Sequence, residues 1–570
     1  MVRENASERR KRREVRKSKK AKKERNEQLK ESRRCRSSGA AHDDDDIDAL
    51  LKELESSRRK LEKVTITALD GAAQPALRYN GVFVAHPTDD ALILHGGERY
   101  DGDMQHVFDD LSVFNIKKNS WKEVQSPLQP SPRCGHAGVT RSAQGGQLVV
   151  FGGEFASRSG SVFRHYSDLW VLDLSTYKWE CVYGDAAPSA SSTKQSAAPS
   201  ARSGHRMAFV EGGKKVVIFG GYFDNGKSSP RYFADCFLFD MDLRLWIRVD
   251  IQTGFYSIPV RSACLFLPHV PSTGRSTAEA ESVVILGGGY ARVRQKGEND
   301  KSVCYQDMYK MSLTAASAGD TYTVRYESLR PTGQSPLTLQ GLRMAQTVHG
   351  DAFGFGGVQE IELDETSIQD VFSCQLVGLS VTGDDRLRWF EPSVGHGKMA
   401  RSKEQGKQER RAQDAEERKT RRRRRAKASS GAAASGSTMT PASASGASII
   451  IEPASEVADA STTGAHPENP GREDELADVM QGQEEGQGKD TGLWPCPRAN
   501  AGVAIKGRNL YIYGGYQEVG ERQVVLSDLL TIDVSKLDEW LCLQESQSHT
   551  WLGSDGSSTS SSSESDSSSE

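Results

Sequence analysis

Long hydrophobic runs and paired metal-binding cysteines are absent from this chain of 570 residues. No stretch approaches the roughly 18 consecutive apolar residues of a membrane-spanning helix. No apolar segment follows the basic N-terminus, which argues against a secretory signal. The nine cysteines are scattered from Cys35 to Cys542 without a Cys-x-x-Cys pair, which argues against both a disulfide framework and a zinc module. We therefore expect an intracellular protein without membrane contact.

Catalytic motifs are also lacking. The sequence contains no P-loop, no Ser nucleophile elbow and no His-Glu-x-x-His, so we expect no enzyme, no cofactor and no metal. The formal net charge of -3 says nothing about nucleic acid, but the charges separate into blocks. Residues 1–38 and 401–427 are basic, 43–46 are four aspartates, and the C-terminal stretch combines Ser with acidic residues. Such blocks indicate tails that meet partners.

A repeated pattern runs through the rest of the chain. Short apolar runs end in a glycine pair six times, at Gly96 and Gly97, Gly152 and Gly153, Gly220 and Gly221, Gly287 and Gly288, Gly356 and Gly357, and Gly514 and Gly515. An Asp precedes a later apolar run in each unit, at Asp110, Asp168, Asp235, Asp307, Asp370 and Asp528. A Trp closes five units, at Trp121, Trp179, Trp246, Trp389 and Trp540. An Arg-centred turn precedes most pairs, at Arg133, Arg202, Arg261 and Arg498, with weaker forms near Arg78 and Arg343.

Each part of this repeat has a physical reading. The apolar runs are short and rich in β-branched and aromatic residues, which predicts strands buried on both faces. A glycine pair at a strand end permits positive φ and a close backbone approach, and the Trp supplies a wide apolar surface. Small sheets of this kind bury their faces only when they close into a ring. In this order, the elements resemble the kelch repeat, and the resemblance implies an all-β, six-bladed kelch-type β-propeller.

Two units depart from the pattern. The fourth lacks the closing Trp, for which Tyr322 or Tyr326 is the expected substitute, and the fifth has Met344 and Ala345 where Ser-Gly or Cys-Gly is expected. Two segments compete to complete the last blade, the alternating residues 64–69 and the strand at Trp540.

The predicted organisation has six parts. They are a disordered basic tail (1–42), an acidic-capped amphipathic helix (43–63), blades one to five (64–391), a long disordered basic and acidic insertion (392–491), blade six (492–545) and a disordered Ser-rich acidic tail (546–570). The basic runs predict either nuclear or nucleolar import signals or contact with RNA or ribonucleoprotein particles. The helix, with Ile47, Leu50, Leu51 and Leu54 on one face, packs either on the propeller itself or on a partner.

The loops after the glycine pairs are the predicted binding surface, because variable loops on a rigid ring usually carry function. Aromatic and Arg side chains dominate interface energies, and the candidates are Arg99, Tyr100, Arg158, Arg164, Tyr222, Arg231, Tyr232, Arg292 and Arg294. The recurring Asp residues are expected to cap turns, and His136 and His205 are expected to be structural because they recur with the repeat. The sequence thus predicts a protein-binding scaffold. The alternative is a substrate receptor of a cullin ubiquitin ligase, although no adaptor-binding domain is visible.

Overall fold

The structure is a computed structural model in which part of the chain is described. The described residues are 47–59, 63–69, 73–160, 162–187, 198–226, 229–252, 258–269, 282–293, 301–316, 321–364, 367–382, 386–395, 493–520, 522–547 and 551. The predicted basic N-terminal tail, most of the insertion and most of the C-terminal tail lie outside them.

Each sequence repeat forms a four-stranded antiparallel unit with its first strand innermost. We number these units along the chain. Unit 1 contains β2 (Val82–Ala85), β3 (Ala91–Tyr100), β4 (Gln105–Asn115) and β5 (Ser120–Gln125), and unit 2 contains β6 (Ala137–Arg141), β7 (Gln147–Phe151), β10 (Leu169–Asp173) and β11 (Lys178–Tyr183). Unit 3 contains β12 (Arg206–Val210), β13 (Lys215–Phe219), β16 (Cys236–Asp240) and β17 (Leu245–Ile251), and unit 4 contains β18 (Leu265–Pro268), β19 (Val283–Gly287), β22 (Met308–Ala315) and β23 (Thr321–Leu329). Unit 5 contains β24 (Arg343–Gln346), β25 (Ala352–Phe355), β28 (Leu376–Val381) and β29 (Leu387–Phe390), and unit 6 contains β30 (Gly502–Lys506), β31 (Asn509–Val519), β32 (Arg522–Asp533) and β33 (Leu541–Gln544).

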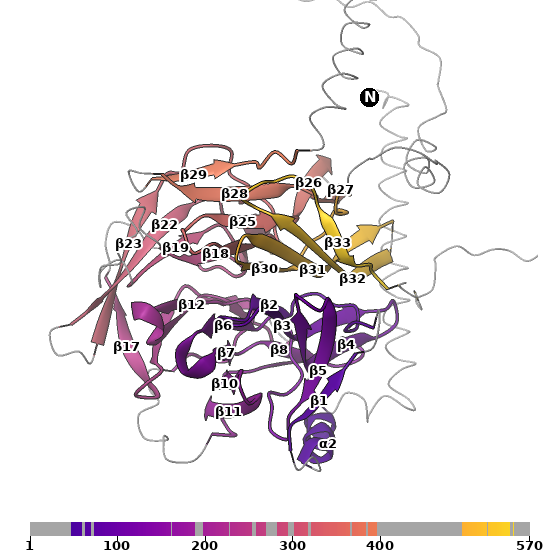
Figure 1. The fold of residues 1–570 in the computed structure, drawn as a ribbon. Coiled ribbons are helices and arrows are strands. Elements are labelled where there is room, and N and C mark those ends of the chain that lie inside the picture. Colours follow the sequence, from indigo (N-terminus) through magenta and orange to yellow (C-terminus); the bar gives the residue numbers. More distant parts are fainter. Residues whose placement is uncertain are drawn as a thin grey trace, which may run out of the picture. The chain divides into compact units, whose positions relative to one another are not determined.

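The innermost strands of the units contact one another in cyclic order. Contacts run from β2 to β6, β12, β18, β24 and β30, and β30 in turn contacts β2. Figure 1 shows the first strands of the chain beside those of the last unit. The predicted all-β kelch-type propeller is confirmed by this arrangement.

The ring closes without exchange of a strand between its first and last units. β1 (Thr65–Ala68), which covers most of residues 64–69, pairs with β5 and is a fifth, outermost strand of unit 1. Of the two segments that compete for the last blade, the strand at Trp540 completes it, because β33, directly after Trp540, occupies the outer edge of unit 6. The side chain of Gln74 donates to the carbonyl of Glu545 at 2.7 Å, so the two ends of the propeller segment lie side by side.

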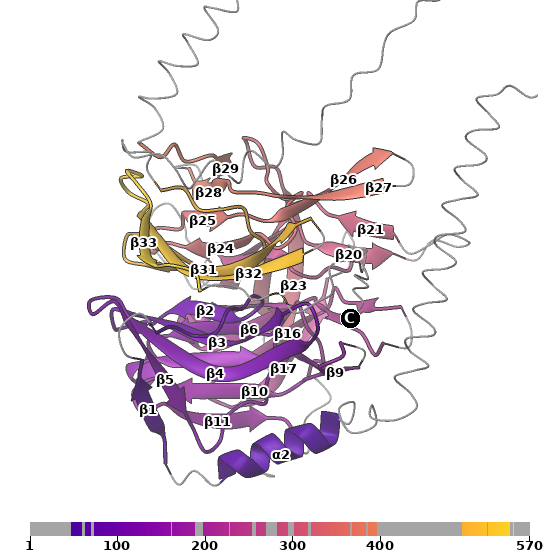
Figure 2. The ribbon, with the colours of Figure 1, turned by 90° about the vertical axis from the view of Figure 1, so that its right-hand side faces the viewer.

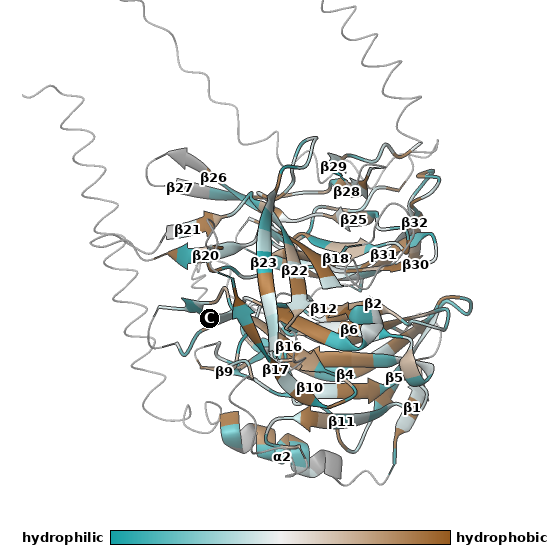
Figure 3. Cartoon of the chain, turned by 90° about the vertical axis from the view of Figure 1, so that its left-hand side faces the viewer, coloured by the Kyte–Doolittle hydropathy of each residue, from teal (hydrophilic) through white to brown (hydrophobic). Residues whose placement is uncertain are grey.

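Units 3 and 4 are joined more closely than the others. Their outer strands β17 and β23 pair in parallel, with Arg248 opposite Thr321, and this merges the two units into one eight-stranded sheet. Figure 3 shows β23 running alongside β22 on this side of the molecule.

The apolar core lies in the wedges between neighbouring units. In one wedge Val149 and Phe151 of unit 2 pack with Trp246 of unit 3, and the other wedges repeat this arrangement. The strands that form them carry hydrophobic residues, brown in Figure 3. Each of the five repeat Trp residues is at most 7 % exposed and fills a wedge, as expected for a broad apolar surface. In unit 4 Tyr326 stands opposite Met311, as Trp246 stands opposite Phe239 in unit 3, so Tyr326 takes the Trp position.

Helix α2 (Ile47–Arg59) packs against the propeller. Ile47 and Leu51 are buried with Phe155 and Tyr166 of unit 2, and Asp48 forms an ion pair with Arg164. Figure 2 shows the helix lying beside β11. Of the two predicted fates of this helix, the structure shows packing on the chain's own propeller.

Candidate functional site

Buried arginine–aspartate pairs account for most of the recurring charged residues. In unit 2 the Nη1 and Nη2 atoms of Arg133 lie 2.8 and 2.9 Å from the two carboxylate oxygens of Asp168. Nη1 also donates to the carbonyl of Gly152 at 3.0 Å. The same pair occurs five times, as Arg78–Asp110, Arg133–Asp168, Arg202–Asp235, Arg261–Asp307 and Arg498–Asp528. The expectation that these Asp side chains cap turns is wrong for the five paired residues. Their carboxylate oxygens instead accept hydrogen bonds from the guanidinium group of a buried Arg.

The Arg133–Asp168 pair remains ionised inside the ring. Burial alone would raise the pKa of Asp168, but the charge and hydrogen bonds of Arg133 outweigh burial and hold the pKa below its ordinary value. The guanidinium of Arg133 is fully buried and stacks over the Tyr166 ring, 4.3 Å from its centroid. Because an unpaired charge at such a depth is strongly destabilising, each Arg requires its Asp.

The glycine pairs connect neighbouring units. Gly152 and Gly153 have φ angles of 62° and 95°, which favour glycine. The N–H of Gly153 donates to the carbonyl of Arg202 in the next unit at 2.9 Å, and a Cβ on Gly152 would lie 2.7 Å from that same oxygen. The bond recurs at Gly97–Arg133, Gly153–Arg202, Gly221–Arg261, Gly357–Arg498 and Gly515–Arg78. One Arg therefore binds its own unit through its side chain and the preceding unit through its backbone.

The glycine pair of unit 4 is displaced by one residue from the prediction. Gly288 and Gly289 have φ angles of 60° and 85°, whereas Gly287 ends strand β19 opposite Met308. The guanidinium of Arg261 donates to the carbonyl of Gly288 at 2.9 Å, as Arg133 does to Gly152. The run of three glycines left the register ambiguous, and Gly287 was the wrong choice.

Unit 5 lacks both partners of the ion pair. Gln340 forms the backbone bridge that Cys134 forms in unit 2, so its neighbour Leu339 stands in the Arg position. The carbonyl of Gln375 accepts from Gly356, as that of Asp168 does from Gly152, so Gln375 stands in the Asp position. The sequence expectation for this unit, Arg343 and Asp370, is therefore wrong. Loss of both charges together leaves no unpaired ion.

Two-stranded hairpins follow the glycine pairs and build one face of the propeller, which we call the loop face. They are β8 (Glu154–Ala156) with β9 (Phe163–His165), β14 (Tyr222–Phe223) with β15 (Arg231–Tyr232), β20 (Tyr290–Val293) with β21 (Lys301–Cys304), and β26 (Val358–Asp364) with β27 (Ser367–Phe372). In units 1 and 6 the long strands β3, β4, β31 and β32 continue into the same region. Figure 2 shows β9, β20, β21, β26 and β27 on one side of the molecule.

The predicted binding residues divide into five groups. Arg158, Arg231 and Arg292 are exposed on the loop face. The rings of Tyr222 and Tyr232 contact one another in a tilted arrangement with centroids 5.8 Å apart. Arg99 and Tyr100 are partly buried at the end of β3. Arg164 is engaged with helix α2 through Asp48. Arg294 lies outside the described residues.

At the centre of the loop face, tyrosines surround two carboxyl groups. Glu154 accepts from the Tyr222 hydroxyl at 2.7 Å, and Glu98 accepts from the side chain of Asn80 at 2.7 Å. Burial raises the pKa of Glu154 to about 8, against the hydrogen bond from Tyr222. The rings of Tyr79 and Tyr516, from the first and last units, lie 4.8 Å apart. The centre therefore combines aromatic rings with two carboxyl groups whose neutral form is favoured by burial.

His136 and His205 lie in the buried layer beneath the loop face. Nε2 of His136 lies 3.1 Å from Nδ1 of His95, and burial holds the pKa of both His136 and His205 well below the ordinary value. Within the described part of the chain, no three His, Cys, Asp or Glu side chains are grouped as metal ligands.

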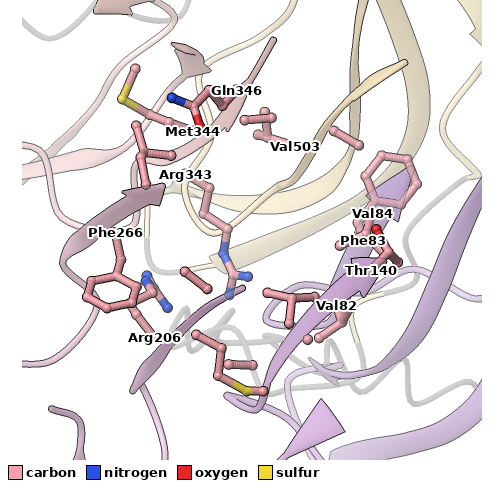
Figure 4. A pocket seen from close by; sticks show the side chains of 18 of the residues that line it. Val82, Phe83, Val84, Thr140, Arg206, Phe266, Arg343, Met344, Gln346 and Val503 are labelled. Atoms are coloured by element: carbon pink, nitrogen blue, oxygen red, sulfur yellow. The ribbon is translucent and has the colours of Figure 1, made fainter. Parts of the chain in front are cut away.

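A channel of about 420 Å³ passes between the innermost strands of all six units. Arg206 and Arg343 reach into it from β12 and β24, as Figure 4 shows. Burial, followed by repulsion from Arg206, lowers the pKa of Arg343 to about 9. The sequence does not indicate either residue as a site, because Arg206 stands at the start of an apolar strand and Arg343 resembles the centre of a repeat Arg turn.

One family model of known proteins matches part of this chain. Residues 39–197 match the family model described as the KLHDC2/KLHL20/DRC7 kelch-repeats domain. The match supports the kelch family.

Curated relatives share the repeat over part of their length. Adagio-like protein 1 of Oryza sativa subsp. japonica is 33% identical over 27% of this chain and 21% of that protein. Adagio-like protein 3 of the same organism is 29% identical over 43% of this chain and 34% of that protein. Acyl-CoA-binding domain-containing protein 5 of Arabidopsis thaliana is 26% identical over 40% of this chain and 30% of that protein. The chain thus spans about a fifth to a third of the length of these relatives.

A solved structure titled "Structure of YjhT" covers 82% of this chain and 98% of its own chain, at 12% identity and a TM-score of 0.42. A likeness at this level carries no argument. Among the described helices, none has the length and apolar character needed to cross a membrane.

Proposed function

We propose that this chain is a non-enzymatic protein-interaction scaffold that binds a partner on its loop face. The observation that carries this proposal is the separation of roles among the recurring residues. The repeat Arg, Asp and Gly residues bond to one another inside the ring, so the fold itself accounts for their recurrence. Arg158, Arg231 and Arg292 remain exposed on the loop face, and residue types of this kind dominate interface energies.

The finer features of the proposal are consistent with this arrangement. We propose six blades, in support of which the six innermost strands contact one another in cyclic order. The motifs IDALLKELE and LYIYGGYQEVGERQVVLSDL resemble kelch domain-containing protein 4. The basic segments within 1–42 and 401–427 would direct the scaffold to the nucleus or nucleolus or bring it to ribonucleoprotein particles.

The second role, a substrate receptor of a cullin ubiquitin ligase, would use the helix near residue 50 to recruit an adaptor. Ile47 and Leu51 of this helix are 6% and 5% exposed because they pack on Phe155 and Tyr166. This occupied apolar face supports the scaffold role over the ligase role.

Affinity purification of the full chain from its own cells tests the proposal. The variant Arg231→Glu/Arg292→Glu reverses two charges on the loop face, and the control Arg248→Glu/Arg325→Glu reverses two exposed charges on the outer strands β17 and β23. We expect the first variant to lose partners that the wild type and control retain. Equal recovery by both variants would reject the loop face as the binding surface. Recovery of cullin components that depends on residues 1–63 would favour the ligase role.

A further inference from the structure

The central channel contains two arginines, Arg206 and Arg343, that pair with no acidic residue in the described part of the chain. Nε of Arg206 donates to the carbonyl of Cys264 at 2.8 Å, and Nη1 reaches the carbonyl of His205 at 3.4 Å. Arg343 contacts the carbonyl of Gly81 and the side-chain oxygen of Asn80, both at 3.3 Å. The Nε atom of Arg343 is buried and has no hydrogen-bond partner among the described residues. Both guanidinium groups are therefore held by weak or neutral acceptors, whereas the five repeat Arg residues each hold a carboxylate.

The surroundings of the two arginines do not neutralise them. Among the described residues that line the channel there is no Asp or Glu, and most are apolar, such as Val82, Met207 and Phe266. Burial lowers the pKa of both arginines, and for Arg343 the charge of Arg206 lowers it further. Two like charges in a largely apolar channel repel one another more strongly than they would in water.

Glu98 is the nearest acidic group in this hydrogen-bond network, and it does not fill the role. Asn80 stands between the two, because its oxygen accepts from Arg343 and its nitrogen donates to Glu98. Burial also raises the pKa of Glu98, which favours its neutral form. The positive charge in the channel therefore stays uncompensated by the described side chains.

We propose that the channel binds a small inorganic oxyanion of the size of phosphate or sulfate between Arg206 and Arg343. The planar guanidinium group matches the oxygens of such ions and forms charge-assisted hydrogen bonds with them. A channel of about 420 Å³ has room for the ion. Its otherwise apolar walls offer few polar groups to a larger ligand, and they strengthen the electrostatic attraction. Figure 4 shows both guanidinium groups within the pocket where the ion would sit.

Thermal unfolding of the purified full chain in phosphate-free buffer tests this site. Inorganic phosphate or sulfate at low millimolar concentration is expected to raise Tm with saturation, since a ligand that binds only the folded state stabilises it. Sodium chloride of equal ionic strength should not do so. In calorimetric titration with phosphate, Arg343→Met should bind about tenfold more weakly or worse, while the surface control Arg248→Met should bind as the wild type does.

Three outcomes would overturn the proposal. One is a wild-type Tm and titration that do not respond to phosphate or sulfate. Another is an unchanged response in Arg343→Met, which would indicate an adventitious ion only. The third is a saturating response to acetate in place of phosphate, which would assign the arginines to a carboxylate. If circular dichroism shows Arg343→Met to be unfolded, Arg206→Met provides the same comparison from the other side of the channel.

Discussion

The backbone N–H of Gly515 donates a hydrogen bond to the carbonyl of Arg78, 3.1 Å away, and this bond joins the last unit to the first. The bond has the same form as that between Gly153 and Arg202 in the middle of the chain. The joint that closes the ring therefore uses the same residue types as the joints within it. The recurring Gly and Arg residues thus form the backbone hydrogen bonds that connect neighbouring sheets.

Removal of one member of an ion pair should destabilise the ring more than removal of both. We expect Arg498→Leu to lower the free energy of unfolding by about 3–5 kcal/mol, because it leaves Asp528 buried without its partner. Arg498→Leu/Asp528→Gln reproduces the residues that unit 5 carries naturally at Leu339 and Gln375, and it should lose less than the single variant. Chemical denaturation of the four proteins of this cycle measures the difference. A double variant less stable than Arg498→Leu would contradict the pairing argument.

The glycine pairs should tolerate no side chain. A Cβ at Gly153 would lie 2.7 Å from the Cβ of His136 and 2.8 Å from the carbonyl of Cys134, on a backbone with φ of 95°. We expect Gly153→Ala to lower the free energy of unfolding by about 3 kcal/mol or more, from clash and backbone strain together. Gly160 is the matched control, because it also has positive φ but no atom within 4 Å of the added Cβ. Gly160→Ala should lose only about 1 kcal/mol, and equal losses in denaturant unfolding would refute the role of close packing.

The buried carboxyl group of Glu154 should make stability depend on pH. Burial raises its pKa from 4.5 to about 8, so between these values the folded chain holds a proton that the unfolded chain has released. The contribution of Glu154 to stability is therefore fully present below about pH 4.5. This contribution is lost as the pH rises through about 8. Glu154→Gln keeps an acceptor for Tyr222 but does not titrate.

The measurement is Tm at about pH 7 and about pH 8.5 for the wild type and Glu154→Gln. This interval lies above the titration of His165, whose pKa is lowered by burial. We expect the Tm of the wild type to fall further than the Tm of the variant between these two pH values. Parallel pH profiles would show that Glu154 is already ionised in the folded chain.

Helix α2 should detach from the propeller when its buried face is made polar. Leu51→Asp places a charge beside Phe155 and Tyr166, and a buried unpaired charge is unfavourable. We expect faster hydrogen exchange across residues 47–59, with little change elsewhere. Lys52→Ala, on the exposed side of the helix, is the control and should leave exchange as in the wild type. Unchanged exchange in Leu51→Asp would mean that the contact does not hold the helix.

The propeller could be predicted from the sequence because the same residue types recur in the same order in each unit. Glycine pairs, closing Trp residues and apolar strands identify each unit, and each marks a position where only a few residue types fit. The roles of Asp168 and its equivalents were harder to predict, because the Arg partner lies 35 residues away and nothing local indicates the contact. The one-residue displacement of this pair, from Gly287 and Gly288 to Gly288 and Gly289, could not be predicted from three consecutive glycines.

The channel site could not be predicted for a different reason. Arg206 and Arg343 lie far apart in the sequence and belong to no shared motif. They meet because β12 and β24 both line the same channel, which is a property of the closed ring. Unit 5 shows a different difficulty. Leu339 occupies the position of the repeat Arg in this unit, so the nearby Arg343 resembled a repeat Arg in the sequence.

Every four-stranded unit is made from one continuous stretch of chain, and the insertion lies between units 5 and 6. Gln74 contacts Glu545 where the propeller segment begins and ends. The order of the units around the ring therefore does not depend on which unit comes first in the chain. A circular permutant that joins these ends by a short linker and opens between β11 and β12 should assemble the same ring.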